Sequence, residues 1–407
     1  MTKRVVVTGI GVYSVLGKNL EAVLDSLYHG KSGIGFDPER KEMGFRSGLT
    51  GIIERPILKG VLPRRMRIGL AEQGEYAYVS TKEALDYAGI DEDYFLKNDV
   101  GILFGNDSST IPVIEAIDGV REKKDTTLLG SGSIFQSMNS TVTMNLSVIF
   151  KLRGVNITIS AACASGAHAI GLGHHFIKHG MQEMIICGGA QEVNAYSMGS
   201  FDGLSAFSIR EDEPTKASRP FDAGRDGLVP SGGAATVILE EYESAKKRGA
   251  PILAEVLGYG FSSDGNHISV PNMEGPTKAL SMAIKDSKVN VNDVDYINPH
   301  ATSTPVGDAN EAKALHNIFG TNKKVKISAT KSMTGHEMWM GGASEIIYSI
   351  LMMKNDFIAP SLNFETPDEF SAKLNIIPKT TSAKINLVVS NSFGFGGTNS
   401  SLVIRKM

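Results

Sequence analysis

The sequence predicts an α/β fold built from two similar halves. Short β-rich segments alternate with helical patterns along all 407 residues, and this alternation is typical of α/β layers with mostly parallel strands. The β-rich segments form two sets of five with the same order of elements, which indicates an internal duplication. The expected halves are residues 1–250 and 251–407, because Gly249 and Pro251 interrupt a charged helix at their junction.

The predicted strands and helices occur in the same order in both halves. In the first half, strands are expected within residues 4–10, 99–106, 155–161, 183–190 and 234–241. In the second half, they are expected within residues 252–260, 294–300, 325–330, 385–392 and 400–406. A helix precedes the fourth strand of each half, over residues 164–180 and 341–354. Two long intervals in the first half, 27–63 and 108–154, do not fit the repeat and are expected to be insertions that carry specificity.

The composition excludes several classes of protein. With 42% hydrophobic residues, 21% charged residues and a net charge of −3, the chain can bury a large core but lacks the cationic field of nucleic-acid or membrane-surface binders. No apolar run approaches the roughly 18 residues of a membrane span, and residues 1–17 fit a first strand and turn better than a signal peptide. Two cysteines, Cys163 and Cys187, make no disulfide framework, so a reducing, cytoplasmic location is expected.

Three other features are expected to be structural. The segment "GIGVYS" has Ser14 where a dinucleotide-binding motif has its third glycine, so a tight strand-to-helix turn is predicted there. His175 and His179 are one helical turn apart, but no cysteine or well-placed carboxylate completes a metal site, so they are expected to be packing or surface residues. Cys187 belongs to an apolar strand and is expected in the core.

Cys163 is the candidate nucleophile. It lies among alanine, serine and glycine residues, between a β-rich segment and a helical one. A helix N-terminus favours the thiolate and lowers the thiol pKa. The small neighbours also leave room for a bulky acyl thioester and allow backbone amides to form an oxyanion hole.

Two histidines complete the predicted site. His300 and His336 each follow a predicted strand, and reactive groups in α/β proteins gather beyond the carboxyl ends of strands. Two neutral histidines can donate hydrogen bonds to a carbonyl oxygen. Such a pair stabilises an enolate without a metal ion.

Four motifs, "ISAACASG", "HATSTPVGD", "KSMTGH" and "NSFGFGGTN", occur in this order along the chain. They resemble hallmarks of the elongating β-ketoacyl-[acyl carrier protein] synthases, type I or II, of the thiolase superfamily. The resemblance covers essentially the whole chain and implies the thiolase fold. That fold is a duplicated, five-layered α/β/α/β/α structure, here with insertions in the first half.

The resemblance also implies a role for each site residue. Cys163 would accept the acyl chain, and His300 and His336 would bind the malonyl thioester and stabilise the enolate formed on loss of carbon dioxide. Lys331 and Glu345 would form the pair that orders the site.

Further positions match the part of the family site that holds the substrate. Thr302 and Thr304 would bind the phosphopantetheine arm, and Phe393 would contact the substrate. Phe395 would be the gating residue, and its amide would join that of Cys163 in the oxyanion hole.

The implied reaction is a decarboxylative Claisen condensation in fatty-acid elongation. An acyl chain on Cys163 would react with malonyl-[acyl carrier protein] to give β-ketoacyl-[acyl carrier protein]. The implied partners are acyl carrier protein, its malonyl and acyl thioesters, and a second copy of the chain in a homodimer. No metal, nucleotide or resident cofactor is expected, since the phosphopantetheine arrives on the carrier. A basic patch is expected to dock the acidic carrier, formed by Arg64, Arg65 and Arg67, with a second candidate run at Arg121, Lys123 and Lys124.

Alternatives and departures from the family pattern remain. The same residues fit a ketosynthase of a specialised polyene or polyketide pathway, whereas Cys163 argues against a non-catalytic partner subunit. A thiolase needs a second catalytic cysteine in the C-terminal half, and neither cysteine lies beyond Cys187. Ala301 replaces the usual glycine of "HGTST", which requires a backbone angle that alanine tolerates. Bulky residues at 338–340, "MWM", replace small ones and leave the preferred chain length undefined.

Overall fold

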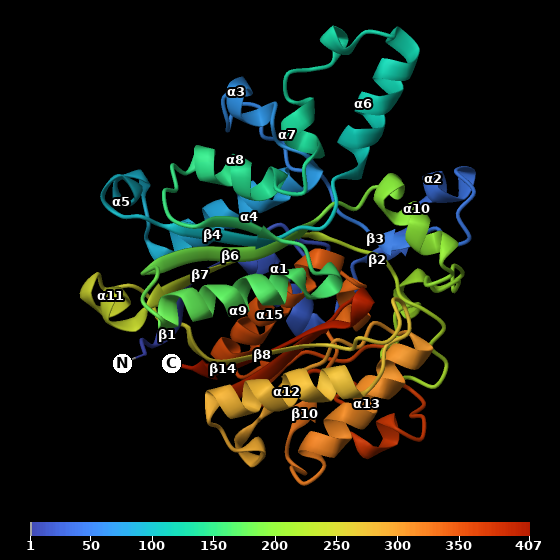
Figure 1. The fold of residues 1–407 in the computed structure, drawn as a ribbon. Helices are drawn as coiled ribbons and strands as arrows, with labels where there is room; N and C mark the ends of the chain where they lie inside the picture. Colours follow the sequence, from blue (N-terminus) through green and yellow to red (C-terminus); the bar gives the residue numbers. More distant parts are fainter. Residues whose placement is uncertain (1) are drawn as a thin grey trace.

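The computed structural model describes residues 2–407 and confirms the duplicated α/β fold (Figure 1). The strands of the first half are β1 (Val5–Ser14), β4 (Gly101–Gly105), β5 (Asn156–Ile159), β6 (Met184–Gln191) and β7 (Gly233–Glu241). Those of the second half are β8 (Ala254–Ser263), β9 (Tyr296–Asn298), β10 (Lys326–Ile327), β13 (Leu387–Phe393) and β14 (Thr398–Lys406).

The two halves have the same strand order, β5-β4-β6-β7-β1 and β10-β9-β13-β14-β8. In each half the second strand runs parallel to the third and the fourth, as β4 does to β5 and β6. The last strand, β7 or β14, is antiparallel to both of its neighbours. Because β7 and β14 each lie between two antiparallel neighbours, β1 and β8 run in the same direction as the other three strands of their half. Four of the five strands in each half are therefore parallel to one another, which confirms the prediction of mostly parallel strands.

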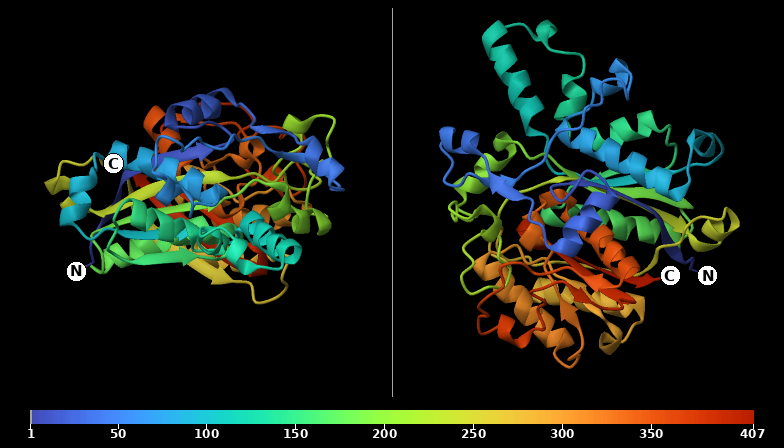
Figure 2. Two further views of the ribbon diagram at one scale, coloured as in Figure 1. Left: turned by 90° about the horizontal axis from the view of Figure 1, so that it is seen from above. Right: turned by 180° about the vertical axis from the view of Figure 1, so that it is seen from behind.

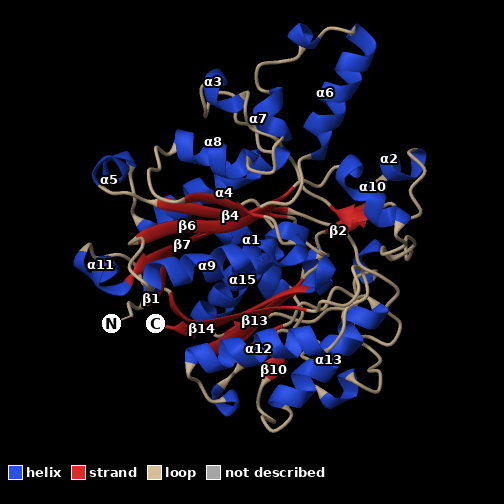
Figure 3. Ribbon diagram, viewed as in Figure 1, coloured by secondary structure: helices blue, strands red, loops and turns tan. Residues whose placement is uncertain are grey.

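The helices form three layers around these strands, which Figure 3 shows as alternating blue and red bands. On the outer face of the first half, α4 (Glu72–Ala88) packs on β1 and β7, and α8 (Thr141–Ile149) packs on β4 and β5. Between the two sets of strands lie α9 (Ser165–Lys178) and α15 (Gly341–Asn355). On the outer face of the second half, α12 (Glu274–Ser287) packs on β8 and β14, with α13 (Pro305–Phe319) beside it. This is the expected α/β/α/β/α layering.

The central helix α15 is buried on every side. Residues 341–353 are all buried, and their sequence is apolar around the whole helix apart from small and paired polar groups, as expected of a helix inside a large core. A Cβ at Gly173 of the neighbouring helix α9 would collide with the sulfur of Cys187 on β6. Glycine at this position thus lets α9 lie close against the strands.

Both predicted insertions contain additional elements. Residues 27–63 include β2 (Ile34–Phe36), α2 (Pro38–Glu42) and β3 (Leu49–Gly51), and residues 108–154 include α6 (Thr110–Lys123) and α7 (Ser133–Ser137). Figure 2 shows that α6 extends well away from the layers. A third insertion, residues 192–232 between β6 and β7, was not predicted, because its mixed polar and glycine-rich sequence has no clear period. It contains α10 (Ala195–Gly203) and contributes to the site described below.

The remaining elements are short or peripheral. They are α1 (Leu20–His29), α3 (Arg64–Arg67), α5 (Glu92–Lys97), α11 (Tyr242–Lys247), α14 (Lys331–Thr334), β11 (Phe357–Ile358) and β12 (Thr381–Ser382). No helix within residues 2–407 combines the length and the apolar character that crossing a membrane requires. The segment "GIGVYS", predicted to be a turn, instead lies inside β1, where a Cβ at Gly11 would collide with the carbonyl of Ser80 on α4. Close packing of α4 on β1 explains this glycine.

Candidate active site

Cys163 lies in a tight turn between a strand and a helix. It belongs to the 3₁₀ segment Ala162–Ala164, after β5 and directly before α9. Ala162 has a positive φ of 46°, in the left-handed region that is costly for a residue with a side chain. The Ser165 hydroxyl closes the turn, since it accepts from the Ala161 amide at 2.8 Å and donates to the Ala162 carbonyl at 2.7 Å. This turn presents the sulfur to the interior of the site.

Burial, rather than the helix end, dominates the acidity of the thiol. Cys163 is only 6% exposed, and desolvation raises the pKa of its thiol to about 12. The backbone amide of Phe395 and the ammonium of Lys331 oppose this effect and lower the pKa. The expectation of an acidified thiol was therefore wrong in direction.

The glycine-rich loop after β13 faces the nucleophile. The backbone amides of Phe395, in the 3₁₀ segment Phe395–Gly397, and of Cys163 itself lie close enough to the sulfur to lower the pKa of its thiol. A Cβ at Gly394 would lie 3.1 Å from the Cys163 nitrogen, so glycine permits this close approach. The Phe393 ring lies at the end of β13, with its centroid 5.8 Å from that of His300. Two amide donors thus converge on the atom that would carry an acyl group.

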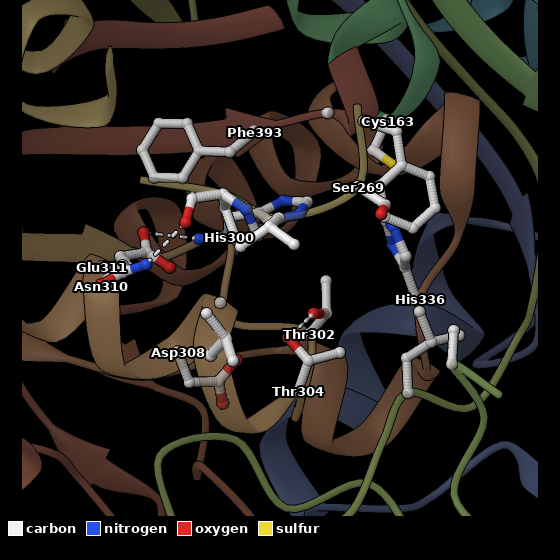
Figure 4. A pocket seen from close by; sticks show the side chains of 18 of the residues that line it. Cys163, Ser269, His300, Thr302, Thr304, Asp308, Asn310, Glu311, His336 and Phe393 are labelled. Carbon is white, nitrogen blue, oxygen red and sulfur yellow. Dashed lines mark hydrogen bonds between the residues drawn. The ribbon is translucent and has the colours of Figure 1, made fainter. Parts of the chain in front are cut away.

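His300 and His336 lie together beside Cys163 (Figure 4). Their ring centroids are 5.3 Å apart and the rings are nearly perpendicular. All three residues line one cavity of about 350 Å³. Burial lowers the pKa of both histidines well below the usual value, and the charge of Lys331 lowers it further. Each imidazole is therefore neutral at pH 7 and retains one N–H donor.

A carboxylate that sequence analysis missed fixes the loop of His300. Glu311 on α13 accepts the backbone amides of His300 at 2.9 Å and Ala301 at 2.7 Å. The side-chain amide of Asn391, on β13, also donates to Glu311, at 3.1 Å. Ala301 is not among the residues of 2–407 that have a positive φ, which explains why alanine is tolerated in place of glycine.

The third insertion holds His336 through its backbone. The His336 amide donates to the Val229 carbonyl at 2.7 Å, and the Ser231 amide donates to the His336 carbonyl at 2.9 Å. Gly335, immediately before His336, has a φ of 68°. The segment that the sequence did not reveal as an insertion thus fixes one of the two histidines.

Lys331 and Glu345 form a buried ion pair. The Lys331 ammonium donates to Glu345 Oε1, and the two side chains are 2% and 1% exposed. Lys331 begins α14 and Glu345 lies on the central helix α15, so the pair connects the His336 segment to the core. Burial raises the pKa of Glu345, and the ammonium of Lys331 opposes this rise. The cation also lowers the pKa of Cys163 and of both histidines.

The threonines and the 264–272 segment line the outer part of the cavity. Thr302 and Thr304 point into it (Figure 4), with their hydroxyl oxygens 3.2 Å apart. Several residues of 264–272, including Ser269 and Pro271, line the same cavity. The two threonines and this segment thus form a passage toward Cys163, which lines the same cavity.

The bulky 338–340 segment separates into site and core residues. Met338 lines the cavity and packs in one apolar cluster with Cys163. The Trp339 indole donates to the Ser108 hydroxyl at 3.2 Å, and its ring centroid lies 6.2 Å from that of Phe201. Met340 belongs to the main core. Two of these three residues therefore surround the nucleophile.

The predicted docking residues lie on the surface, apart from the cavity. Arg64 and Arg65 on α3 are exposed, whereas Arg67 is half-buried and donates to the Leu62 carbonyl at 3.1 Å. None of the three is among the described residues that line the cavity. Arg121 and Lys123 lie at the end of α6, followed by Lys124.

The histidines of α9 have a carboxylate neighbour that was not expected. Ligand atoms of His174, His175 and Asp286 lie within 4.8 Å of one another, so a carboxylate lies near His175, but His179 is not part of this group. However, Asp286 already accepts from the Lys178 ammonium at 2.8 Å, which places a cation where a metal ion would compete. His175 stacks on His179 with centroids 5.7 Å apart. Cys187 is fully buried, as expected.

Comparison with known proteins identifies the family. Residues 2–245 match the beta-ketoacyl synthase N-terminal domain and residues 253–365 match the C-terminal domain. The 3-oxoacyl-[acyl-carrier-protein] synthase 1 of Haemophilus influenzae is 42% identical over 409 residues, which cover 99% of each chain.

Solved structures agree over the full length. A beta-ketoacyl synthase from Burkholderia phymatum superimposes with a TM-score of 0.93 at 35% identity, covering 100% of both chains. A ketosynthase in complex with its type II polyketide-synthase acyl-carrier protein gives a TM-score of 0.91 at 27% identity, again over 100% of both chains. With the duplicated layers and the clustered cysteine and histidines, these matches lead to one conclusion: the chain belongs to the beta-ketoacyl synthase family.

Proposed function

We propose that this protein condenses an acyl chain held on Cys163 with malonyl-[acyl carrier protein], releasing carbon dioxide and β-ketoacyl-[acyl carrier protein]. The observation that carries the proposal is the convergence of Cys163, His300 and His336 on one cavity of about 350 Å³. Two backbone amides near the sulfur can donate to the carbonyl oxygen of the acyl thioester. Two neutral imidazoles beside it can donate to the carbonyl oxygen of the malonyl thioester. Each oxygen that gains negative charge thus has its own donors.

In the first half-reaction, the acyl group moves from its carrier to the enzyme. The Cys163 thiolate attacks the acyl thioester, and the oxyanion that forms accepts hydrogen bonds from the amides of Cys163 and Phe395. Collapse breaks the bond to the carrier's phosphopantetheine sulfur, which leaves as a thiol with the proton from Cys163. The phosphopantetheine belongs to the carrier, and Thr302 and Thr304 are placed to contact it along the passage.

In the second half-reaction, a malonyl thioester loses its carboxylate. His300 and His336 donate to the thioester carbonyl, so that the electron pair left by carbon dioxide is held as an enolate. The enolate carbon attacks the thioester on Cys163, and collapse of the second oxyanion expels the Cys163 thiolate. The chain leaves two carbons longer. Burial, together with the charge of Lys331, keeps both imidazoles neutral, and Phe393 packs beside His300.

Substitution of the histidines separates the two half-reactions. His336→Ala is expected to lower the condensation kcat about 10²–10³-fold, the loss typical of removing one donor to a developing oxyanion, while acylation of Cys163 stays within about tenfold. His300→Ala is expected to behave in the same way. The measurements are single-turnover acylation by intact mass and malonyl-carrier decarboxylation. Loss of acylation in parallel with decarboxylation would contradict the assigned roles.

Fatty-acid elongation is favoured over the alternatives. The curated relative that is 42% identical is a 3-oxoacyl-[acyl-carrier-protein] synthase. A specialised polyene or polyketide ketosynthase would use the same chemistry. It would differ in the acyl chain that is bound to Cys163. A non-catalytic partner subunit would not require the complete arrangement of Cys163, His300 and His336 around one cavity.

The partner we propose is an acyl carrier protein. A ketosynthase related to this chain is found in complex with its acyl-carrier protein, and Arg64 and Arg65 offer exposed positive charge on α3. We place the enzyme in the cytoplasm, consistent with two free cysteines. The proposed steps require no metal, nucleotide or resident cofactor.

Arg65→Glu tests the docking surface. At low salt the change is expected to raise the Kd for acyl carrier protein about three- to tenfold, because it reverses one exposed charge facing an acidic partner. The measurement is titration of the carrier at 20 and 500 mM salt, with the difference disappearing at high salt. Lys247→Glu, on the exposed side of α11, is the matched control. Equal Kd values for Arg65→Glu and the wild type at low salt would reject α3 as the docking site.

We also propose that two copies of the chain form a homodimer through β5. This strand lies at the edge of the sheet, pairs only with β4 among the described residues, and begins with two exposed residues, Asn156 and Ile157. Ile157 in β5 and Val148 on the adjoining helix α8 are 43% and 68% exposed. An unprotected edge with apolar neighbours favours pairing with an identical edge.

A further inference from the structure

Asp107 connects a loop of the first half directly to the nucleophile turn. It follows β4 by two residues, and its Oδ2 accepts a hydrogen bond from the Ala162 amide at 2.9 Å. This bond spans 55 residues of sequence. Ser165, the other side chain that ties this turn, belongs to the same helix end. Asp107 therefore anchors the turn from outside.

Ala162 needs such an anchor. Its φ of 46° is unusual for alanine, because the left-handed region brings Cβ too close to the backbone of a residue with a side chain. The next residue is Cys163, so a change at Ala162 would rotate both the sulfur and the amide that faces it. A charged acceptor also gives one of the stronger hydrogen bonds to a backbone amide. The strained conformation persists because neighbouring groups fix it.

We propose that Asp107 is a positioning residue for the nucleophile: its carboxylate holds Ala162, and through it the sulfur and amide of Cys163, in the geometry of the oxyanion hole. This role rests on the proposed function of Cys163 and adds a residue outside the four family motifs. Asp107 does not touch the reacting atoms. Its contribution is made through the backbone of the turn.

The same carboxylate has a second effect on the thiol. Its negative charge raises the pKa of Cys163, whereas the ammonium of Lys331 on α14 lowers it. His300 and His336, which share the cavity, are neutral and add no charge. Glu192, after β6, accepts from Ser108 and Thr110 next to Asp107 and is itself largely buried. Removing the charge of Asp107 alone should therefore make the thiol more acidic.

Two substitutions separate position from charge. Asp107→Asn keeps an oxygen acceptor and removes the charge, whereas Asp107→Ala removes both. Asp93→Asn, an exposed aspartate on α5, is the matched control. The readouts are the condensation kcat and KM for malonyl-[acyl carrier protein], and the pH profile of Cys163 alkylation by iodoacetamide. If Asp107→Ala fails to fold, Asp107→Ser replaces it, because a serine hydroxyl is too short to reach Ala162.

The expected results differ between the two variants. Asp107→Ala is expected to lower kcat at least about tenfold with KM within about twofold, as for a misplaced catalytic group. Asp107→Asn is expected to keep kcat within about threefold of wild type. Its alkylation profile should shift to lower pH, with a rate at neutral pH roughly three- to tenfold higher.

Two results would overturn the proposal. One is a loss of kcat in both variants or in neither, because the presence of an oxygen that accepts from the Ala162 amide would then not determine kcat. The other is an alkylation profile of Asp107→Asn that superimposes on the wild type. Failure of the wild type itself to acquire an acyl group on Cys163 would instead reject the proposed function, and the alkylation profile would still report on Asp107.

Discussion

Cys163→Ala is expected to abolish condensation, with a fall of at least about 10³-fold in kcat. The substitution removes the only thiol that lines the cavity within the described residues, and without it no acyl-enzyme forms. Decarboxylation of malonyl-[acyl carrier protein] should continue, because His300 and His336 keep their positions. Product formation and carbon dioxide release, measured on the same samples, report these two outcomes separately.

Cys187→Ala is the matched control for the nucleophile. Cys187 is also fully buried, but it packs between β6 and α9 in the main core and does not line the cavity. Its replacement is expected to cost some stability and leave condensation intact. Full condensation by Cys163→Ala, or equal losses in both variants, would contradict the assignment of the nucleophile.

Lys331→Met is expected to lower both stability and activity. Removing one partner of a buried ion pair leaves the other uncompensated, which typically costs about 3–5 kcal/mol. Glu345 would then take up a proton, because its pKa is already raised by burial. The pKa values of His300, His336 and Cys163 would all rise, since Lys331 now lowers each of them. Urea denaturation and the pH profile of kcat measure the two effects.

A second lysine and a double substitution control this prediction. Lys354→Met, on the exposed end of α15, loses a hydrogen bond and a cation–π contact, both with Tyr87, and should behave like wild type. Lys331→Met combined with Glu345→Leu should recover much of the stability but not the activity, because no charge is then left buried alone. If the urea concentration at the midpoint of unfolding were the same for Lys331→Met and the wild type, the Lys331–Glu345 ion pair would not stabilise the fold as assigned here.

Local patterns made much of the fold predictable. Strand and helix periods, with the order of five strands repeated, indicate the duplication, and both halves have the same strand order. Four of the five strands in each half run in one direction, as the alternation of strands and helices predicts, but the alternation does not reveal that β7 and β14 run against them. The 192–232 insertion was missed as well, although its Val229 and Ser231 hold His336.

The site was predictable only where chemistry and motif coincide. Cys163, His300 and His336 follow strands and have the residue types that the reaction needs. Glu311 and Asp107 could not be found in this way, because each acts on the backbone of a residue 10 to 55 positions away and forms no local pattern. The acidity of Cys163 was misjudged because the sequence showed the helix end but not the depth of burial.

The most direct test of the central claim is a single-turnover experiment followed by intact mass. The wild-type protein is incubated with acyl-[acyl carrier protein], and the acyl-enzyme is isolated and mapped by peptide mass before malonyl-[acyl carrier protein] is added. We expect one acyl group per chain, located on Cys163, that disappears as β-ketoacyl-[acyl carrier protein] two carbons longer is formed. An acyl group on another residue, or one that malonyl-[acyl carrier protein] does not remove, would contradict the account.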